Sequence, residues 1–136
     1  MYLLDTNVIS ETRKLRPHGG VLVWLAGVPA GQLSLCALTL GELQAGAERT
    51  RRQDEAKAAA LDSWIDQLAA TWDVIPMDAA IFREWARLMD GKPNQLFEDA
   101  MIAATARVRG LTVVTRNVRD FRLFPVEVLN PFSPGG

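Results

Sequence analysis

Short apolar segments alternate with stretches of helical spacing along the chain, and this alternation restricts the fold more than any other feature. The apolar segments have strand length and lie at residues 2–4, 32–36, 73–77, 111–115 and 126–129. Between them, apolar residues recur every three or four positions, as on one face of a helix. Strands alternating with helices predict an α/β three-layer sandwich, in which helices cover both faces of a mostly parallel sheet.

Local signals indicate where several helices begin and end. Thr39 and Glu42 form a capping-box pattern, which predicts a helix that begins after Thr39. The helical stretches 40–52 and 54–70 are compatible with a helical hairpin or with one bent helix. A helix over residues 97–109 is expected to end at Gly110, because glycine readily adopts left-handed backbone angles.

The length of 136 residues and the hydrophobic fraction of 49% fit one domain with a well-filled interior. We expect a single domain over residues 1–130 and an irregular tail over residues 131–136. No apolar run approaches the roughly 20 residues of a membrane span, and no signal segment is evident, so a cytoplasmic location without membrane contact is expected. One cysteine and one histidine leave no zinc-binding pattern.

Four acidic residues lie where strands end or helices begin. Asp5 ends the first strand, and Asp120 follows the fourth after a short turn. Glu42 lies near the start of the helix after the second strand, and Asp99 opens the helix before the fourth. Parallel strands present their carboxyl ends at one edge of the sheet, where α/β proteins place their chemistry. The four acids are therefore expected to converge there.

A cluster of acids without histidine suits a hard divalent cation. Asp99 heads an apolar helix face formed by Ile102, Ala103 and Ala106, and a carboxylate there is costly unless something compensates its charge. Carboxylate oxygens favour Mg²⁺ or Mn²⁺ over zinc. Such an ion can activate water and stabilise charge on a phosphodiester.

Basic residues accompany these acids. The 16 acids less these four leave 12, against 15 Lys and Arg residues. Three arginines follow Glu42 and three surround Asp120, a distribution that suits a phosphate backbone: Arg49, Arg51, Arg52, Arg116, Arg119 and Arg122.

Each acid also has a simpler structural explanation. Asp5 could cap the following helix, and Glu42 could be only a capping-box partner. Asp99, with Glu98 beside it, could complement a helix dipole, and Asp120 could be a turn former. None of these local roles explains why all four acids fall at one predicted edge.

Ordered motifs across nearly the whole chain resemble those of the PIN-domain ribonucleases, in particular the VapC-type toxins of type II toxin–antitoxin pairs and their FitB-like branch. The matching segments are Leu3–Glu11, Leu40–Gly46, Phe97–Ala106, Leu111–Phe121 and Val128–Phe132.

This resemblance implies a PIN fold and an Mg²⁺- or Mn²⁺-dependent endoribonuclease that acts as a toxin. It implies that Asp5, Glu42, Asp99 and Asp120 are metal ligands and catalytic residues, and that Thr6, Thr115 and Asn117 line the substrate site. It further implies a homodimer, held inactive in a larger assembly with a small, DNA-binding, VapB-like antitoxin.

Two other functions use similar folds. A receiver-like phosphotransfer module would require paired acids after the first strand and a lysine after a late strand, where this chain has Asp5-Thr6-Asn7 and Arg116. A catalytically silent interaction module with the PIN fold would not need all four acids.

Overall fold

The computed structural model describes residues 1–133, and its centre is a five-stranded sheet in the order β3-β2-β1-β4-β5. All four strand pairings are parallel, as the alternation of strands and helices predicts. In the central pairings, Leu3 lies opposite Ser34 on one side and Val113 on the other. The strands are β1 (Tyr2–Leu4), β2 (Leu33–Cys36), β3 (Asp73–Ile75), β4 (Thr112–Val114) and β5 (Val128–Leu129).

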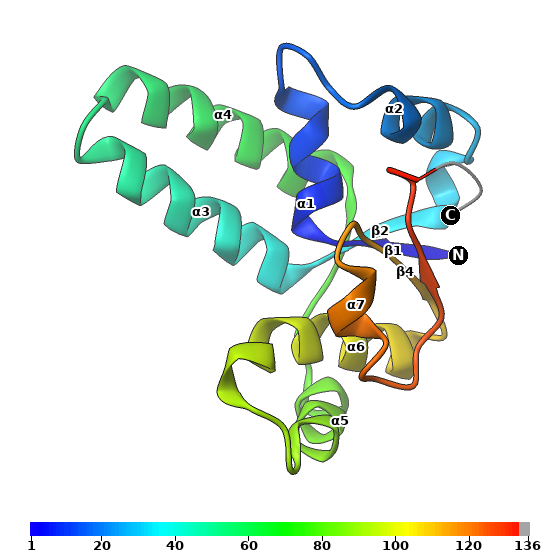
Figure 1. The fold of residues 1–136 in the computed structure, drawn as a ribbon. Coiled ribbons are helices and arrows are strands. Elements are labelled where there is room, and N and C mark those ends of the chain that lie inside the picture. Colours follow the sequence, from blue (N-terminus) through cyan, green and yellow to red (C-terminus); the bar gives the residue numbers. More distant parts are fainter. Residues whose placement is uncertain (134–136) are drawn as a thin grey trace.

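Helices cover both faces of this sheet, so the predicted α/β three-layer arrangement is confirmed (Figure 1). Three short 3₁₀ turns, Ser10–Arg13, Ala30–Gln32 and Asn94–Leu96, connect the elements. The helices are α1 (Thr6–Ile9), α2 (Gly19–Ala26), α3 (Ala37–Arg51), α4 (Glu55–Thr71), α5 (Ala79–Met89), α6 (Phe97–Arg109) and α7 (Val118–Phe121).

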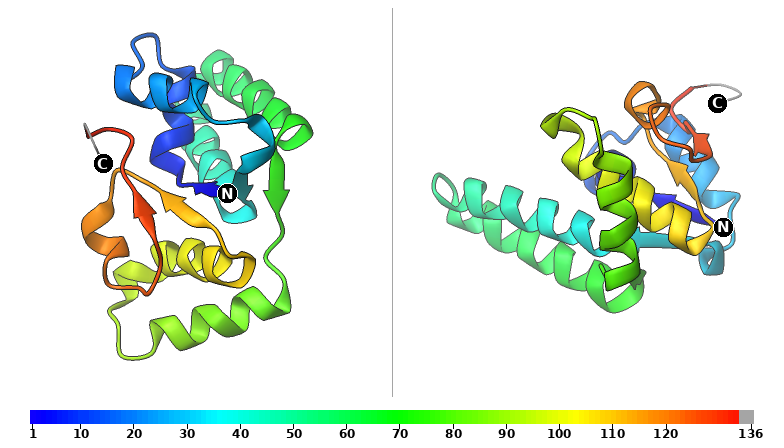
Figure 2. Two further views of the ribbon diagram at one scale, coloured as in Figure 1. Left: turned by 90° about the vertical axis from the view of Figure 1, so that its right-hand side faces the viewer. Right: turned by 90° about the horizontal axis from the view of Figure 1, so that it is seen from below.

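Helices α3 and α4 form a hairpin that extends away from the sheet, which decides between the two arrangements left open by the sequence (Figure 2). The Arg51 guanidinium connects the two helices at the tip of the hairpin. It pairs with Glu48 on α3 and with Glu55 on α4, and it lies 2.6 Å from Asp62 on α4. Since these partners belong to both helices, the network holds the hairpin closed.

The predicted capping box is wrong. Helix α3 begins at Ala37, directly after β2, and Cys36 occupies the N-cap position without a side-chain cap. Thr39 therefore lies inside the first turn and is fully buried. Its hydroxyl lies 3.3 Å from that of Thr6, so a tertiary contact replaces the expected local cap. The predicted end of α6 is confirmed, because Gly110 has a φ of 67°.

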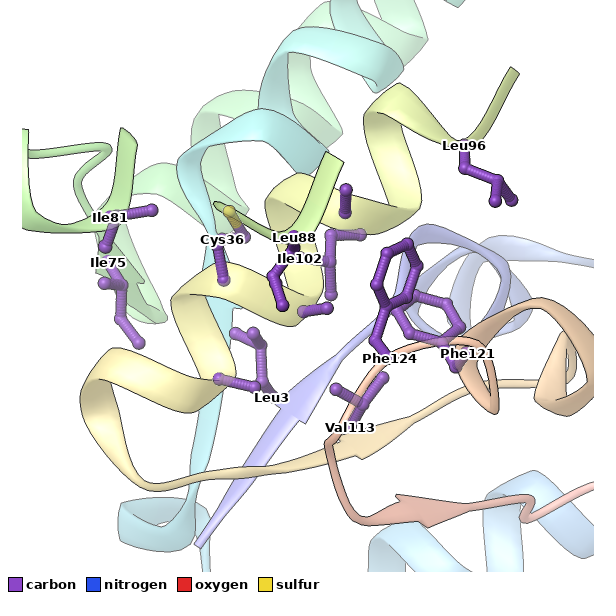
Figure 3. Packing of buried hydrophobic residues seen from close by; sticks show 14 residues of the cluster. Leu3, Cys36, Ile75, Ile81, Leu88, Leu96, Ile102, Val113, Phe121 and Phe124 are labelled. Atoms are coloured by element: carbon purple, nitrogen blue, oxygen red, sulfur yellow. The ribbon is translucent and has the colours of Figure 1, made fainter. Parts of the chain in front are cut away.

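Two apolar clusters lie on opposite faces of the sheet. One packs β1 and β4 against α5, α6 and α7, with Leu3, Ile102 and Phe121 among its fully buried members (Figure 3). The other packs Leu4 and Leu35 against α1, α2 and the hairpin. Both clusters hold the carboxyl ends of the strands rigidly, and the candidate site lies at those ends.

The tail from residue 131 begins with an irregular turn in which Phe132 packs against the second cluster. The rest of the predicted tail, residues 134–136, lies outside the described residues. Among residues 1–133, no helix is both long and apolar enough to cross a membrane.

Candidate active site

Asp5 lies at the carboxyl end of the central strand and is only 6% exposed. Its Oδ1 accepts a 2.7 Å hydrogen bond from the backbone N–H of Thr6 and so caps α1. Its Oδ2 accepts hydrogen bonds from the Thr115 hydroxyl at 2.8 Å and from the Asn7 amide at 3.2 Å. Asp5 therefore is a helix cap, and its second oxygen also belongs to a polar network reaching the end of β4.

Glu42 lies beside the start of α1. The Thr6 hydroxyl donates a 3.0 Å hydrogen bond to its Oε1. Because α3 begins at Ala37, Glu42 lies in the second turn, where it is half-buried and faces the end of β1. The first helical residue after Asp5 thus fixes the position of the second acid.

Asn117 connects the remaining two acids. Its Nδ2 donates hydrogen bonds to Asp99 Oδ2 at 3.2 Å and to Asp120 Oδ2 at 3.0 Å. Its backbone N–H donates to the Thr115 hydroxyl at 2.9 Å. One continuous set of hydrogen bonds therefore runs from Asp5 through Thr115 and Asn117 to Asp99 and Asp120.

The pKa values of these carboxyls reflect burial and mutual repulsion. Burial raises the pKa of Asp5. Burial also raises the pKa of Asp99 to about 6, with further contributions from the negative charges of Asp5 and Asp120. The pKa of Glu42 rises to about 8, chiefly through burial and then through the neighbouring carboxyl of Glu98. The site therefore disfavours its own negative charge.

The structure brings all seven sequence-predicted site residues to one edge of the sheet, and it adds two that the prediction omitted. Asn7 donates to Asp5, and its side-chain oxygen accepts the backbone N–H of Arg116 at 3.1 Å, which joins the ends of β1 and β4. The sequence signal for this role was the position of Asn7 directly after Asp5 and Thr6 at the end of the strand. Glu98 faces Glu42, but its proximity to Asp99 in sequence could not show which way it points.

The donor set fits a hard divalent cation in chemical type, because it consists of carboxylate, amide and hydroxyl oxygens. As the side chains of residues 1–133 are placed, no three Asp, Glu, His or Cys side chains converge closely enough to hold an ion. Asn117 lies between Asp99 and Asp120 and bonds to both. The raised pKa of Asp99, to which the negative charge of Asp120 contributes, indicates that a cation would relieve the repulsion between these carboxyls.

Known proteins are similar to this chain in sequence and in architecture. A family model described as PIN domain matches residues 2–125. The chain is 34% identical to VapC ribonuclease Y4jK of Sinorhizobium fredii, with 98% of this chain and 99% of the relative covered. It is 32% identical to Toxin FitB of Neisseria gonorrhoeae, with 97% and 99% covered.

A solved structure of FitAB bound to an IR36 DNA fragment superposes on this chain with a TM-score of 0.85. The sequence identity is 30%, and the superposition covers 98% of this chain and 97% of the other. The similarity therefore extends over the sheet, the hairpin and the edge that carries the acids.

Proposed function

Since the chain belongs to the PIN-domain family, among VapC-type ribonucleases and FitB-like toxins, we propose that it is the toxin of a toxin–antitoxin pair and hydrolyses RNA at the acids Asp5, Glu42, Asp99 and Asp120. The observation that carries this proposal is the hydrogen-bonded network at the sheet edge. Its hydrogen bonds connect Asp5 with Asp99 and Asp120, and the Thr6 hydroxyl connects Glu42 to the start of α1 beside Asp5. Burial and the neighbouring negative charges raise the pKa of Asp99, which supports a role for a cation here.

In this proposal Asp5, Glu42, Asp99 and Asp120 hold Mg²⁺ or Mn²⁺, which when bound activates water and offsets charge on the phosphodiester. Thr115 and Asn7 fix the orientation of Asp5 through its Oδ2. Thr6 positions Glu42 through a 3.0 Å hydrogen bond, and burial with the neighbouring Glu98 raises the pKa of Glu42 to about 8, so a bound cation would favour its ionised form. Hydrolysis by water would leave a 3′-hydroxyl and a 5′-phosphate.

We also propose a small, DNA-binding, VapB-like antitoxin as partner, and a homodimer of this chain within the larger assembly. The similarity to FitB in a complex described as bound to DNA supports this arrangement. The toxin would act in the cytoplasm, where its RNA substrates lie. Co-purification of this chain with the product of the adjacent reading frame would test the partner.

The proposed cleavage depends on a bound divalent cation. The purified chain is expected to cleave RNA in Mg²⁺ or Mn²⁺ and to lose activity in excess EDTA, because the carboxyls need a cation to act together. Denaturing gel electrophoresis of a labelled RNA measures cleavage, and re-addition of Mn²⁺ should restore it. Full activity in EDTA would overturn the metal role, and no cleavage under any condition would favour a catalytically silent module.

The stability of the metal-free protein is expected to depend on pH through the acids of the site. An acid whose pKa is raised by folding binds its proton more tightly in the folded state, so the metal-free protein loses stability as the pH rises through that range. For Asp99 and Glu42 the range extends from about pH 4 to about pH 8. Because a cation displaces those protons, the increase in Tm on adding Mn²⁺ should be larger at pH 8 than at pH 5.5.

Thermal unfolding with and without Mn²⁺ at the two pH values measures this difference. The variant Glu42→Gln should lose much of the pH dependence, because it removes the group with the highest pKa of the site. An equal Tm increase at both pH values in the unchanged protein would contradict the proposed ligand set.

A further inference from the structure

Helix α7 presents different chemistry on its different sides. Phe121 is fully buried in the core below the sheet, and the Asp120 carboxylate accepts a hydrogen bond from Asn117 in the acidic site. Arg119 within the helix and Arg122 at its C-cap are both exposed. Although Asp120 lies between these arginines in sequence, it does not pair with them, and neither forms an ion pair within residues 1–133.

The two arginines line a pocket of about 330 Å³ between α7 and the end of β5. Apart from the two arginines, the residues that line the pocket are apolar or neutral and polar, and none is a carboxylate. The lining residues are Val118, Arg119, Arg122, Val128, Asn130 and Ser133. Its volume is at the lower end of the range for small-molecule sites, roughly 300–1,000 Å³. A group about the size of one nucleotide fits this space.

The outer wall of the pocket is held in place by the rest of the fold. Asn130 donates to the Ser133 hydroxyl at 3.3 Å and accepts the backbone N–H of Phe132 at 2.9 Å. The Phe132 ring lies 5.0 Å from the His18 ring and 4.8 Å from the guanidinium carbon of Arg116. The turn is therefore docked on the body of the protein, and a third cation is fixed beside it.

Two other arginines near this end of the sheet pair with acids. Arg107 bonds to Glu84 at 2.7 Å and to the carbonyl oxygen of Pro125, and Arg109 lies 3.3 Å from Asp78. These contacts hold α6 against α5 and the β5 segment. Arg119 and Arg122 have no such structural partner, so their charges remain available to a ligand beside the acids.

We propose that Arg119 and Arg122 form a subsite for an RNA backbone phosphate that neighbours the phosphate being cleaved. Guanidinium groups bind phosphate oxygens in a forked geometry, which fixes the orientation of the strand as well as its position. Asp120 on the same short helix belongs to the acidic site. An RNA strand whose phosphate binds in this subsite is therefore held at a fixed position relative to the acids. This inference rests on the proposed ribonuclease function and assigns part of its substrate contact.

The test compares Arg119→Ala/Arg122→Ala with the matched control Arg13→Ala/Arg16→Ala. The control pair has the same spacing, is also exposed, forms no ion pair within residues 1–133, and lies at the end of the 3₁₀ turn Ser10–Arg13 and just after it. Both variants remove the same charge. Binding of a single-stranded RNA oligonucleotide is measured by fluorescence anisotropy in EDTA over a salt series, and kcat and KM are measured in Mn²⁺.

In the α7 variant we expect the Kd and KM for RNA to rise about 30-fold with kcat little changed. The slope of log Kd against log salt should decrease by about 1.4, which corresponds to two lost contacts with a single strand. The control should change little in each quantity. Arg119→Lys/Arg122→Lys should recover most of the salt slope but only part of the affinity, because lysine keeps the charge without the fork.

Equal RNA binding by the α7 variant and the Arg13→Ala/Arg16→Ala control would overturn the subsite even if the unchanged protein cleaves RNA. A loss confined to kcat would also overturn it, because a binding subsite acts on KM. Absence of cleavage by the unchanged protein in both Mg²⁺ and Mn²⁺ would instead overturn the proposed function. The binding measurement in EDTA keeps these failures distinguishable, because it does not depend on cleavage.

Discussion

Asp99→Asn is expected to reduce RNA cleavage by at least about 1,000-fold while making the metal-free protein more stable. The loss follows because an amide carries no negative charge for a cation. The gain follows because burial and the charges of Asp5 and Asp120 disfavour the ionised carboxyl, whose pKa is raised to about 6. Asp99 is half-buried and solvent screens it, so we expect a gain of only about 1 kcal/mol, or roughly 3 °C in Tm.

Cleavage assays in Mn²⁺ and thermal unfolding in EDTA measure the two effects on the same preparation. The asparagine can still accept the hydrogen bond from Asn117, so the local geometry is preserved. Asp66→Asn on α4 is a matched control, because this acid is exposed and should change neither quantity. A fully active Asp99→Asn variant would remove Asp99 from the catalytic site.

Phe121→Ala should lower the free energy of unfolding by about 3–5 kcal/mol, which is a large fraction of the stability of a domain this size. Phe121 is fully buried between α7 and the sheet, where its ring packs within the apolar cluster that β1 and β4 form with α5, α6 and α7 (Figure 3). Its removal leaves a cavity under a helix of only four residues. Since that helix also carries Asp120, any folded fraction should have reduced activity.

Urea denaturation measures the change in unfolding free energy. Leu123→Ala provides the control, because this side chain is 55% exposed and its removal should cost at most about 0.5 kcal/mol. Phe121→Leu should give an intermediate cost, because most of the cavity is filled. A loss below about 1 kcal/mol in Phe121→Ala would show that α7 is anchored by other contacts.

The arrangement of the acids could be predicted because it follows from the sheet. Once the strands are parallel, Asp5 and Asp120 must lie at the same edge, since each follows a strand or a short turn after one. Asp99 could be placed from its helix face, as Ile102, Ala103 and Ala106 are all buried beside it. These predictions depend on periodicity and chain order, which a sequence contains directly.

Contacts between distant segments could not be predicted. The capping pattern at Thr39 is a valid local signal, but the contact between its hydroxyl and Thr6 depends on how β1 and α3 approach each other. The hairpin closes through Arg51 and Asp62, which are 11 positions apart on different helices. In each case a tertiary contact determined what local rules left open.

The central position of β1 has a consequence for when the protein becomes active during its synthesis. Strand β1 pairs with β4, whose residues 112–114 are translated long after those of β1. Until then β1 lacks one neighbour, and Asp5 lacks the Thr115 hydroxyl that orients it. Under the proposed function, the cleavage site can form only after residue 120 has left the exit tunnel. A ribosome translating this chain would therefore not be exposed to the nuclease before that point.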